Sequence, residues 1–74
     1  MQPDPLIFQK DLGAKVREIR SSLGYSQEGF AGACGLHRTH VSLLERGRLD
    51  LKLSTLRKVA EILKVSLSEL LQGL

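Results

Sequence analysis

The chain has a single cysteine, Cys34, among its 74 residues, so no disulfide within the chain can stabilise it. No apolar run approaches the roughly 18 residues that a membrane-spanning helix needs. The first residues, Met-Gln-Pro-Asp-Pro, lack the basic segment and apolar stretch of a signal peptide. An unpaired cysteine without an export signal indicates a reducing cytoplasm, and we expect no membrane partner.

Signs of catalysis are missing too. The hydroxyl side chains have no accompanying base-and-acid arrangement, and no glycine-rich phosphate loop occurs. Strand patterns, internal repeats and low-complexity segments are also absent. We therefore expect a protein that is not an enzyme and that uses no cofactor, no metal and no small-molecule ligand.

The size and the charge of the chain favour particular partners. A chain of 74 residues forms one domain with a thin core, and oligomerisation is the remaining way to stabilise it. The net charge is +3, and residues 34–58 alone carry a net charge of +4. Their basic side chains are Arg38, Arg46, Arg48, Lys52, Arg57 and Lys58. This asymmetry is typical of a surface that faces phosphate groups.

The first part of the chain predicts an arm and a long helix. Residues 1–6 hold both prolines and no periodicity, so we expect a flexible arm there and one folded domain over residues 7–74. Apolar residues then recur at steps of three and four, at Phe8, Leu12, Val16, Ile19 and Leu23. This stripe predicts an amphipathic helix that ends at Gly24.

Four shorter helices are predicted after it. The second begins after the N-cap residue Ser26, and the third runs from about Arg38 to Glu45. The fourth begins after Ser54, and the fifth begins after Ser66, which has capping-box spacing to Glu69. The fold class is therefore all-α, with five helices.

The segment between the third and fourth helices alternates apolar and polar residues. Its leucines are Leu49, Leu51 and Leu53. We interpret it as a loop held on the core through Leu53; a short strand is the alternative.

Residues 26–47 have the pattern of a helix-turn-helix. Two short helices flank Gly35, whose lack of a side chain suits a tight turn. Ala31 is small enough for the helices to cross closely, and Val41 and Leu44 can anchor the second helix while its other face stays polar. Such a helix can enter a DNA groove.

The sequence of this segment, SQEGFAGACGLHRTHVSLLERG, resembles the lambda-repressor-like, or XRE-type, helix-turn-helix family. The similarity extends from about Leu12 to Leu71 and includes Leu53-Ser54-Thr55-Leu56. The compact size also resembles the controller proteins of restriction–modification systems, although stand-alone repressors and some antitoxins share it. The resemblance implies a bacterial regulator that binds a double-stranded DNA operator in the cytoplasm or nucleoid.

The resemblance places the base-reading residues on the third helix: Arg38, Thr39, Ser42 and Leu43. A positive charge at a helix N-terminus opposes the helix dipole, so stability does not favour Arg38 there. A guanidinium can donate two hydrogen bonds to guanine, with phosphate contact or plain exposure as alternatives. Leu43 could meet a thymine methyl group or be ordinary surface.

Five further residues are expected to bind phosphates: Gln27, His40, Arg46, Arg48 and Lys52. Gln27 opens the second helix, where backbone amides attract an anion. Arg46, Arg48 and Lys52 follow the recognition helix, where contacts to the DNA backbone fall in this family. Each could instead be a solvated charge.

Two other roles are implied. Arg20 and Glu45 match a pair that bridges the first and third helices in this family, so we expect a structural salt bridge. One recognition helix reads few bases, and related domains pair on palindromes, so we expect a homodimer. Leu71, Leu74 and Leu51 are the expected interface because little chain remains to cover them.

Two competing interpretations have weaker support. Cys34, His37 and His40 form C-x2-H-x2-H, but this spacing is not that of zinc motifs and no fourth ligand lies nearby. The same helices could bind a protein partner instead of DNA. Gly29 and Gly32 weaken the second helix, and this departure from the family keeps that alternative open.

Overall fold

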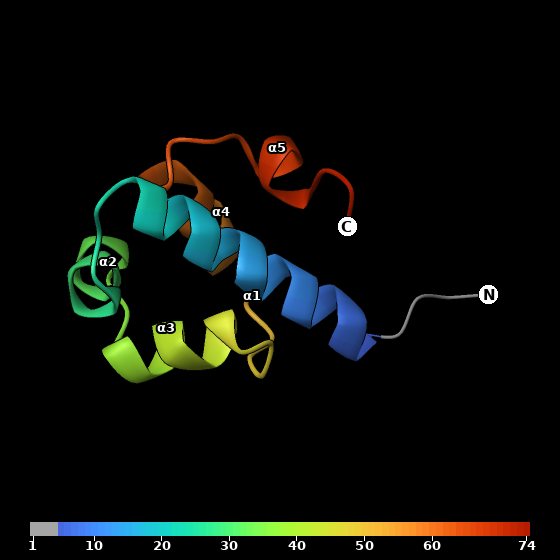
Figure 1. Cartoon of the computed structure of the whole chain (residues 1–74), viewed down its shortest axis with the longest axis horizontal. Coiled ribbons are helices and arrows are strands. Elements are labelled where there is room, and N and C mark those ends of the chain that lie inside the picture. Colours follow the sequence, from blue (N-terminus) through green and yellow to red (C-terminus); the bar gives the residue numbers. More distant parts are fainter. Residues whose placement is uncertain (1–4) are drawn as a thin grey trace.

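The computed structural model describes residues 5–74, which form five α-helices and no strand. The helices are α1 (Pro5–Ser22), α2 (Gln27–Cys34), α3 (Arg38–Glu45), α4 (Leu53–Ile62) and α5 (Leu67–Leu71). Figure 1 shows α1 as a long central helix, with α2 and α3 on one side and α5 on the other. The all-α, five-helix prediction is confirmed.

The core lies where α1, α2, α3, α4 and α5 meet. Its fully buried large side chains come from all five helices and from Leu63, which follows α4: Val16, Phe30, Val41, Leu44, Val59, Leu63 and Leu70. Helix α1 packs against α3 and α5, while α4 packs against α2 and α5. The short helices α2 and α3 are therefore held by the rest of the fold as well as by each other.

Local signals in the sequence define most helix ends. Gly24 and Gly35 both have positive φ, which glycine adopts without steric cost. Ser26 accepts a hydrogen bond from the Gly29 N–H at 2.9 Å and so caps α2. Ser66 and Glu69 form the predicted capping box of α5. The hydrogen bond from the Ser66 backbone N–H lowers the pKa of Glu69, and the Ser66 hydroxyl acts in the same direction.

Helix α1 begins earlier than predicted. Pro5 is its first residue, so the predicted arm over residues 1–6 is wrong for positions 5 and 6, and residues 1–4 lie outside the described part of the chain. A proline fits the first helical turn because its missing N–H would have no partner there.

Helix α4 also begins earlier than predicted, at Leu53, so Ser54 lies inside the helix and does not cap it. The carbonyl of Lys52 accepts the first helical hydrogen bond, from the Leu56 N–H at 2.9 Å. No side chain caps this helix start.

The prediction that Leu53 holds the preceding loop on the core is wrong, because Leu53 is 69% exposed. Leu49 and Leu51 pack against the core instead, while Asp50 and Lys52 are exposed. This alternation suits extended backbone, in which successive side chains point to opposite sides. The alternation stops at Leu53 because the helix begins there.

Candidate nucleic-acid interface

Helix α3 has one face in the core and the other towards solvent. Val41 and Leu44 are buried and hold it in place. Arg38 and Thr39 are exposed on its first turn, while Ser42 and Leu43 are half-buried one turn later. The structure therefore brings the four expected base-reading residues onto neighbouring turns, with Arg38 and Thr39 the most accessible.

The Arg38 side chain is exposed to solvent. Among residues 5–74 it makes no hydrogen bond or ion pair, although it stands at the N-terminus of α3, where a positive charge is unfavourable. His37, the residue before it, provides no side-chain cap. The first turn of α3 thus presents a guanidinium to solvent without stabilising the helix.

Helices α2 and α3 are joined by a tight turn at Gly35, whose φ is +70°. The Leu36 N–H donates to the Ala31 carbonyl at 2.8 Å and closes the end of α2. Ala31 is buried in the core, and α2 packs against α3. The turn and the small residue fix the direction in which α3 leaves α2.

Arg20 and Glu45 form a salt bridge between α1 and the last residue of α3. Arg20 donates from Nε to Glu45 Oε2 at 2.6 Å and from Nη2 to Oε1 at 3.0 Å. Its Nη1 donates to the Tyr25 carbonyl at 2.7 Å, just before α2 begins. The hydrogen bonds to Glu45 raise the pKa of Arg20 above its usual value. These contacts connect α1, the start of α2 and the end of α3.

Gln27, an expected phosphate contact, is also bound to Glu45. Its Nε2 donates to Glu45 Oε1 at 3.1 Å, and the residue is half-buried. Sequence reasoning placed Gln27 on the DNA side and Glu45 inside the fold, without linking them. No spacing rule predicts a contact between residues 18 positions apart on different helices.

The expected cationic contacts lie after and beside α3. Arg46, Arg48 and Lys52 are exposed, as is His40 on α3 itself. Arg46 turns back and donates from Nε to the Ser42 carbonyl at 3.3 Å. The cations thus come from the C-terminal end of α3 and the following loop.

A hollow of about 280 Å³ lies beside α3. His40 and Lys52 line it together with Asp50 and Thr55, which sequence reasoning did not single out. Asp50 is exposed and brings a negative charge among the expected phosphate contacts. The net charge of residues 34–58 includes Asp50, but its presence in the same hollow as His40 depends on how the loop folds.

The C-x2-H-x2-H residues are divided between core and surface. Cys34 is buried, and burial raises its thiol pKa to about 11, while the charge of Lys58 acts in the opposite direction. His37 and His40 are exposed, with their rings 5.7 Å apart. In the described residues, no group of three His, Cys, Asp or Glu side chains could hold a metal ion.

The helix-turn-helix family profile matches residues 16–70, most of the chain. The chain belongs to the helix-turn-helix family. Control protein C.BamHI of Bacillus amyloliquefaciens is 43% identical over 60 residues, which are 80% of this chain and 74% of that protein. A hypothetical transcription factor of Neisseria meningitidis serogroup B is 41% identical over 69 residues, 93% of this chain. The match spans 65% of the length of the Neisseria protein.

Solved structures of the family have the same fold. The restriction–modification controller protein C.AhdI from Aeromonas hydrophila matches with a TM-score of 0.85 and 34% identity. The match covers 92% of this chain and 99% of that protein. Within residues 5–74, no helix has the length and apolar character needed to cross a membrane.

Proposed function

We propose that this chain binds a palindromic operator in double-stranded DNA as a homodimer and regulates transcription in the bacterial cytoplasm. Its relatives support a role as a restriction–modification controller or as a stand-alone repressor or activator. The observation that carries the proposal is the outer face of α3. Val41 and Leu44 anchor this helix, while Arg38 and Thr39 remain exposed. An anchored helix with an accessible polar face can enter the major groove.

The expected contacts divide into residues that contact bases and residues that contact phosphates. Arg38, Thr39, Ser42 and Leu43 meet base edges or thymine methyl groups in the groove. His40, Arg46, Arg48 and Lys52 meet phosphates and fix the protein on the duplex, a role that carries no sequence information. Gln27, the fifth expected phosphate contact, is bound to Glu45 instead. The exposure of Arg46, Arg48 and Lys52 just after α3 supports this division.

Replacing Arg38 with alanine should weaken specific binding selectively. The loss of two hydrogen bonds to a guanine should cost about 1–3 kcal/mol, or roughly 5-fold to 150-fold in affinity, and should relax sequence preference at one base pair of each half-site. Stability should stay the same or rise slightly, because an unfavourable charge leaves the start of α3. Quantitative binding to all four bases at each operator position tests this.

Lys52→Ala is the matched control for Arg38→Ala. Loss of a phosphate contact should weaken binding to every sequence about equally and make the salt dependence shallower by about one counterion per contact. If Arg38→Ala behaves in the same uniform way, Arg38 binds phosphate and the base-reading assignment is wrong.

The dimer surface is proposed around α5. Leu51, the third expected interface residue, lines the hollow beside α3 with His40. Leu74 is 39% exposed, and Leu71 is half-buried and packs partly on the monomer core. A five-residue helix at the edge of the fold leaves these side chains incompletely covered. A second copy of the chain would cover them.

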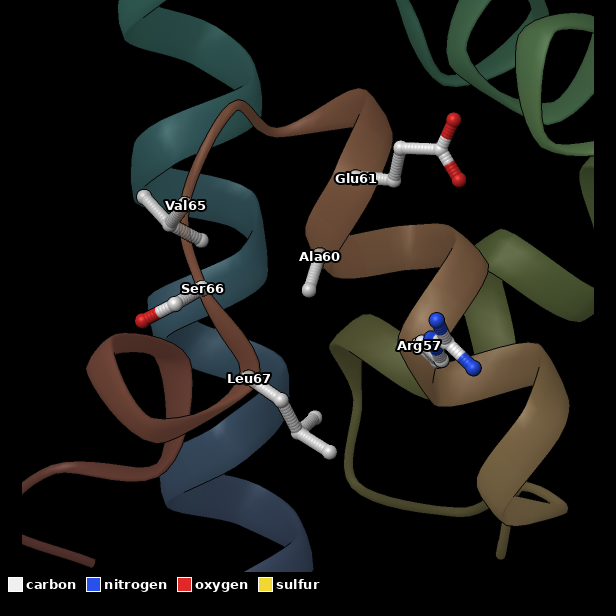
Figure 2. Close-up of a pocket in the computed structure, with 6 residues that line it drawn as sticks. All are labelled: Arg57, Ala60, Glu61, Val65, Ser66 and Leu67. Atoms are coloured by element: carbon white, nitrogen blue, oxygen red, sulfur yellow. The ribbon is translucent and has the colours of Figure 1, made fainter.

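A groove beside α5 supports a symmetric partner. Figure 2 shows it between α4 and the segment leading into α5, with Leu67 extending towards α4. Its volume is about 420 Å³, and its lining residues are Arg57, Ala60, Glu61, Val65, Ser66 and Leu67. Arg57 and Glu61 give it one charge of each sign. In a two-fold interface a patch meets its own copy, so opposite charges on one patch can pair across the axis.

Leu71→Asp and Leu74→Asp should both produce monomers and weaken operator binding. A charge buried against a second copy would lose its hydration, and it would repel its symmetry mate. Leu53→Asp, at a leucine 69% exposed on the other end of α4, is the control and should leave the mass unchanged. Sedimentation equilibrium gives the mass of each variant. An unchanged mass for Leu74→Asp would contradict this interface, since that leucine has the smaller role in the monomer core.

A further inference from the structure

The contact between Gln27 and Glu45 links the two ends of the helix-turn-helix. Gln27 is the first residue of α2, and Glu45 is the last residue of α3. The 3.1 Å hydrogen bond from Gln27 Nε2 to Glu45 Oε1 therefore joins the start of one helix to the end of the other. The turn at Gly35 joins the same two helices at their other ends.

The partners of Glu45 set the direction of the Gln27 side chain. A carboxylate paired with arginine accepts hydrogen bonds and donates none, so Gln27 must present its nitrogen rather than its oxygen. Glu45 Oε1 also accepts from Arg20 Nη2 at 3.0 Å, and Oε2 accepts from Arg20 Nε at 2.6 Å. Arg20 is held in turn by the Tyr25 carbonyl, two residues before Gln27. Both side chains that bind Glu45 are thus tied to the start of α2.

We infer that Gln27 is a positioning residue, which acts on DNA binding through Glu45 by fixing the end of α3 against the start of α2. Its amide nitrogen is bound to Glu45 and does not serve as a phosphate ligand. Arg46 follows Glu45 directly, and Arg48 lies two residues further on. The position of Glu45 therefore also sets the positions of these two cations. The inference rests on the proposed function for its effect on DNA. Its structural part concerns the protein alone.

Gln27→Met tests this role because methionine has a similar length and lacks the amide. In the DNA-free protein we expect amide hydrogens at the last turn of α3 to exchange several-fold faster, by NMR. Operator binding should weaken by up to about tenfold, which corresponds to about a tenth of the molecules keeping α3 in its binding position. Gln9→Met, at a half-buried glutamine of α1, is the chemical control and should change neither quantity. Ile62→Val, a half-buried residue of α4, controls for a small general loss of stability and should leave affinity unchanged.

An operator series separates positioning from direct contact. Each phosphate of one half-site is replaced in turn by an uncharged methylphosphonate, and the affinity loss of Gln27→Met is measured on each duplex. A positioning residue loses the same factor on all of them. The inference would be overturned if Gln27→Met cost no affinity on the duplex that lacks one particular phosphate charge, and if amide exchange in α3 were unchanged. Gln27 would then be a direct contact to that phosphate. If the wild-type chain binds no duplex specifically, the proposed function fails, and the exchange measurement still decides whether Gln27 holds α3.

Discussion

Glu45→Ala should abolish DNA binding by unfolding the domain. The Glu45 side chain is 3% exposed and its partner Arg20 is 10% exposed, so the variant leaves a buried guanidinium without its partner. Breaking such a pair typically costs about 3–5 kcal/mol. A single core in a chain this short rarely supplies more than about 3–5 kcal/mol, so the variant should lose nearly all of its stability. Urea unfolding followed by circular dichroism measures this loss.

Two further variants distinguish a structural Glu45 from one that touches DNA. Glu18→Ala removes an exposed carboxylate of α1 and should leave the unfolding midpoint almost unchanged. Arg20→Met combined with Glu45→Leu replaces the whole pair with apolar side chains and should recover much of the stability, because no buried charge remains. A folded Glu45→Ala protein that has lost only DNA binding would contradict the structural role.

Gly13→Ala should destabilise the domain by about 3 kcal/mol. Gly13 is buried where α1 crosses the end of α3, and a Cβ atom there would collide with the carbonyl of Leu44 and lie 2.8 Å from that of Glu45. These are backbone atoms that cannot rotate aside, so α1 and α3 would have to separate. Overpacking typically costs about 1–3 kcal/mol, and a collision with rigid backbone lies at the upper end. The separation would also strain the salt bridge from Arg20 to Glu45.

Gly32→Ala is the matched control in α2. Gly32 is exposed, and no atom of residues 5–74 outside its own helix lies within 4 Å of the added Cβ. Alanine should stabilise the domain by about 0.5–1 kcal/mol, because it restricts the unfolded chain and favours the helix. Thermal unfolding of the two variants should give shifts of opposite sign. A Gly13→Ala protein as stable as the wild type would show that α1 does not approach α3 this closely.

The sequence predicted those features that depend on neighbouring residues. The bounds of α3, the cap at Ser26 and the capping box of Ser66 and Glu69 all follow from local spacing and side-chain chemistry. The anchors Val41 and Leu44 follow from helical periodicity in the same way. Local rules sufficed because each feature is decided within about two helical turns.

Features that depend on distant parts of the chain could not be predicted in this way. Gly13 drew no attention within the α1 pattern, because only the crossing with α3 explains the absence of a side chain. The hydrogen bond from Gln27 to Glu45 joins two helices. Which loop leucines reach the core depends on the start of α4 at Leu53. The salt bridge of Arg20 and Glu45 was expected solely from the family resemblance.

The most direct test of the central claim is selection of binding sites from a random pool of duplex DNA, followed by a salt titration on the selected sequence. The account predicts a two-fold palindrome with half-sites about 34 Å apart or a multiple of that distance. It also predicts that log affinity falls steeply and linearly with log salt concentration. Failure to enrich any sequence, with only weak salt-sensitive binding, would contradict operator recognition and favour a protein partner for the exposed face of α3.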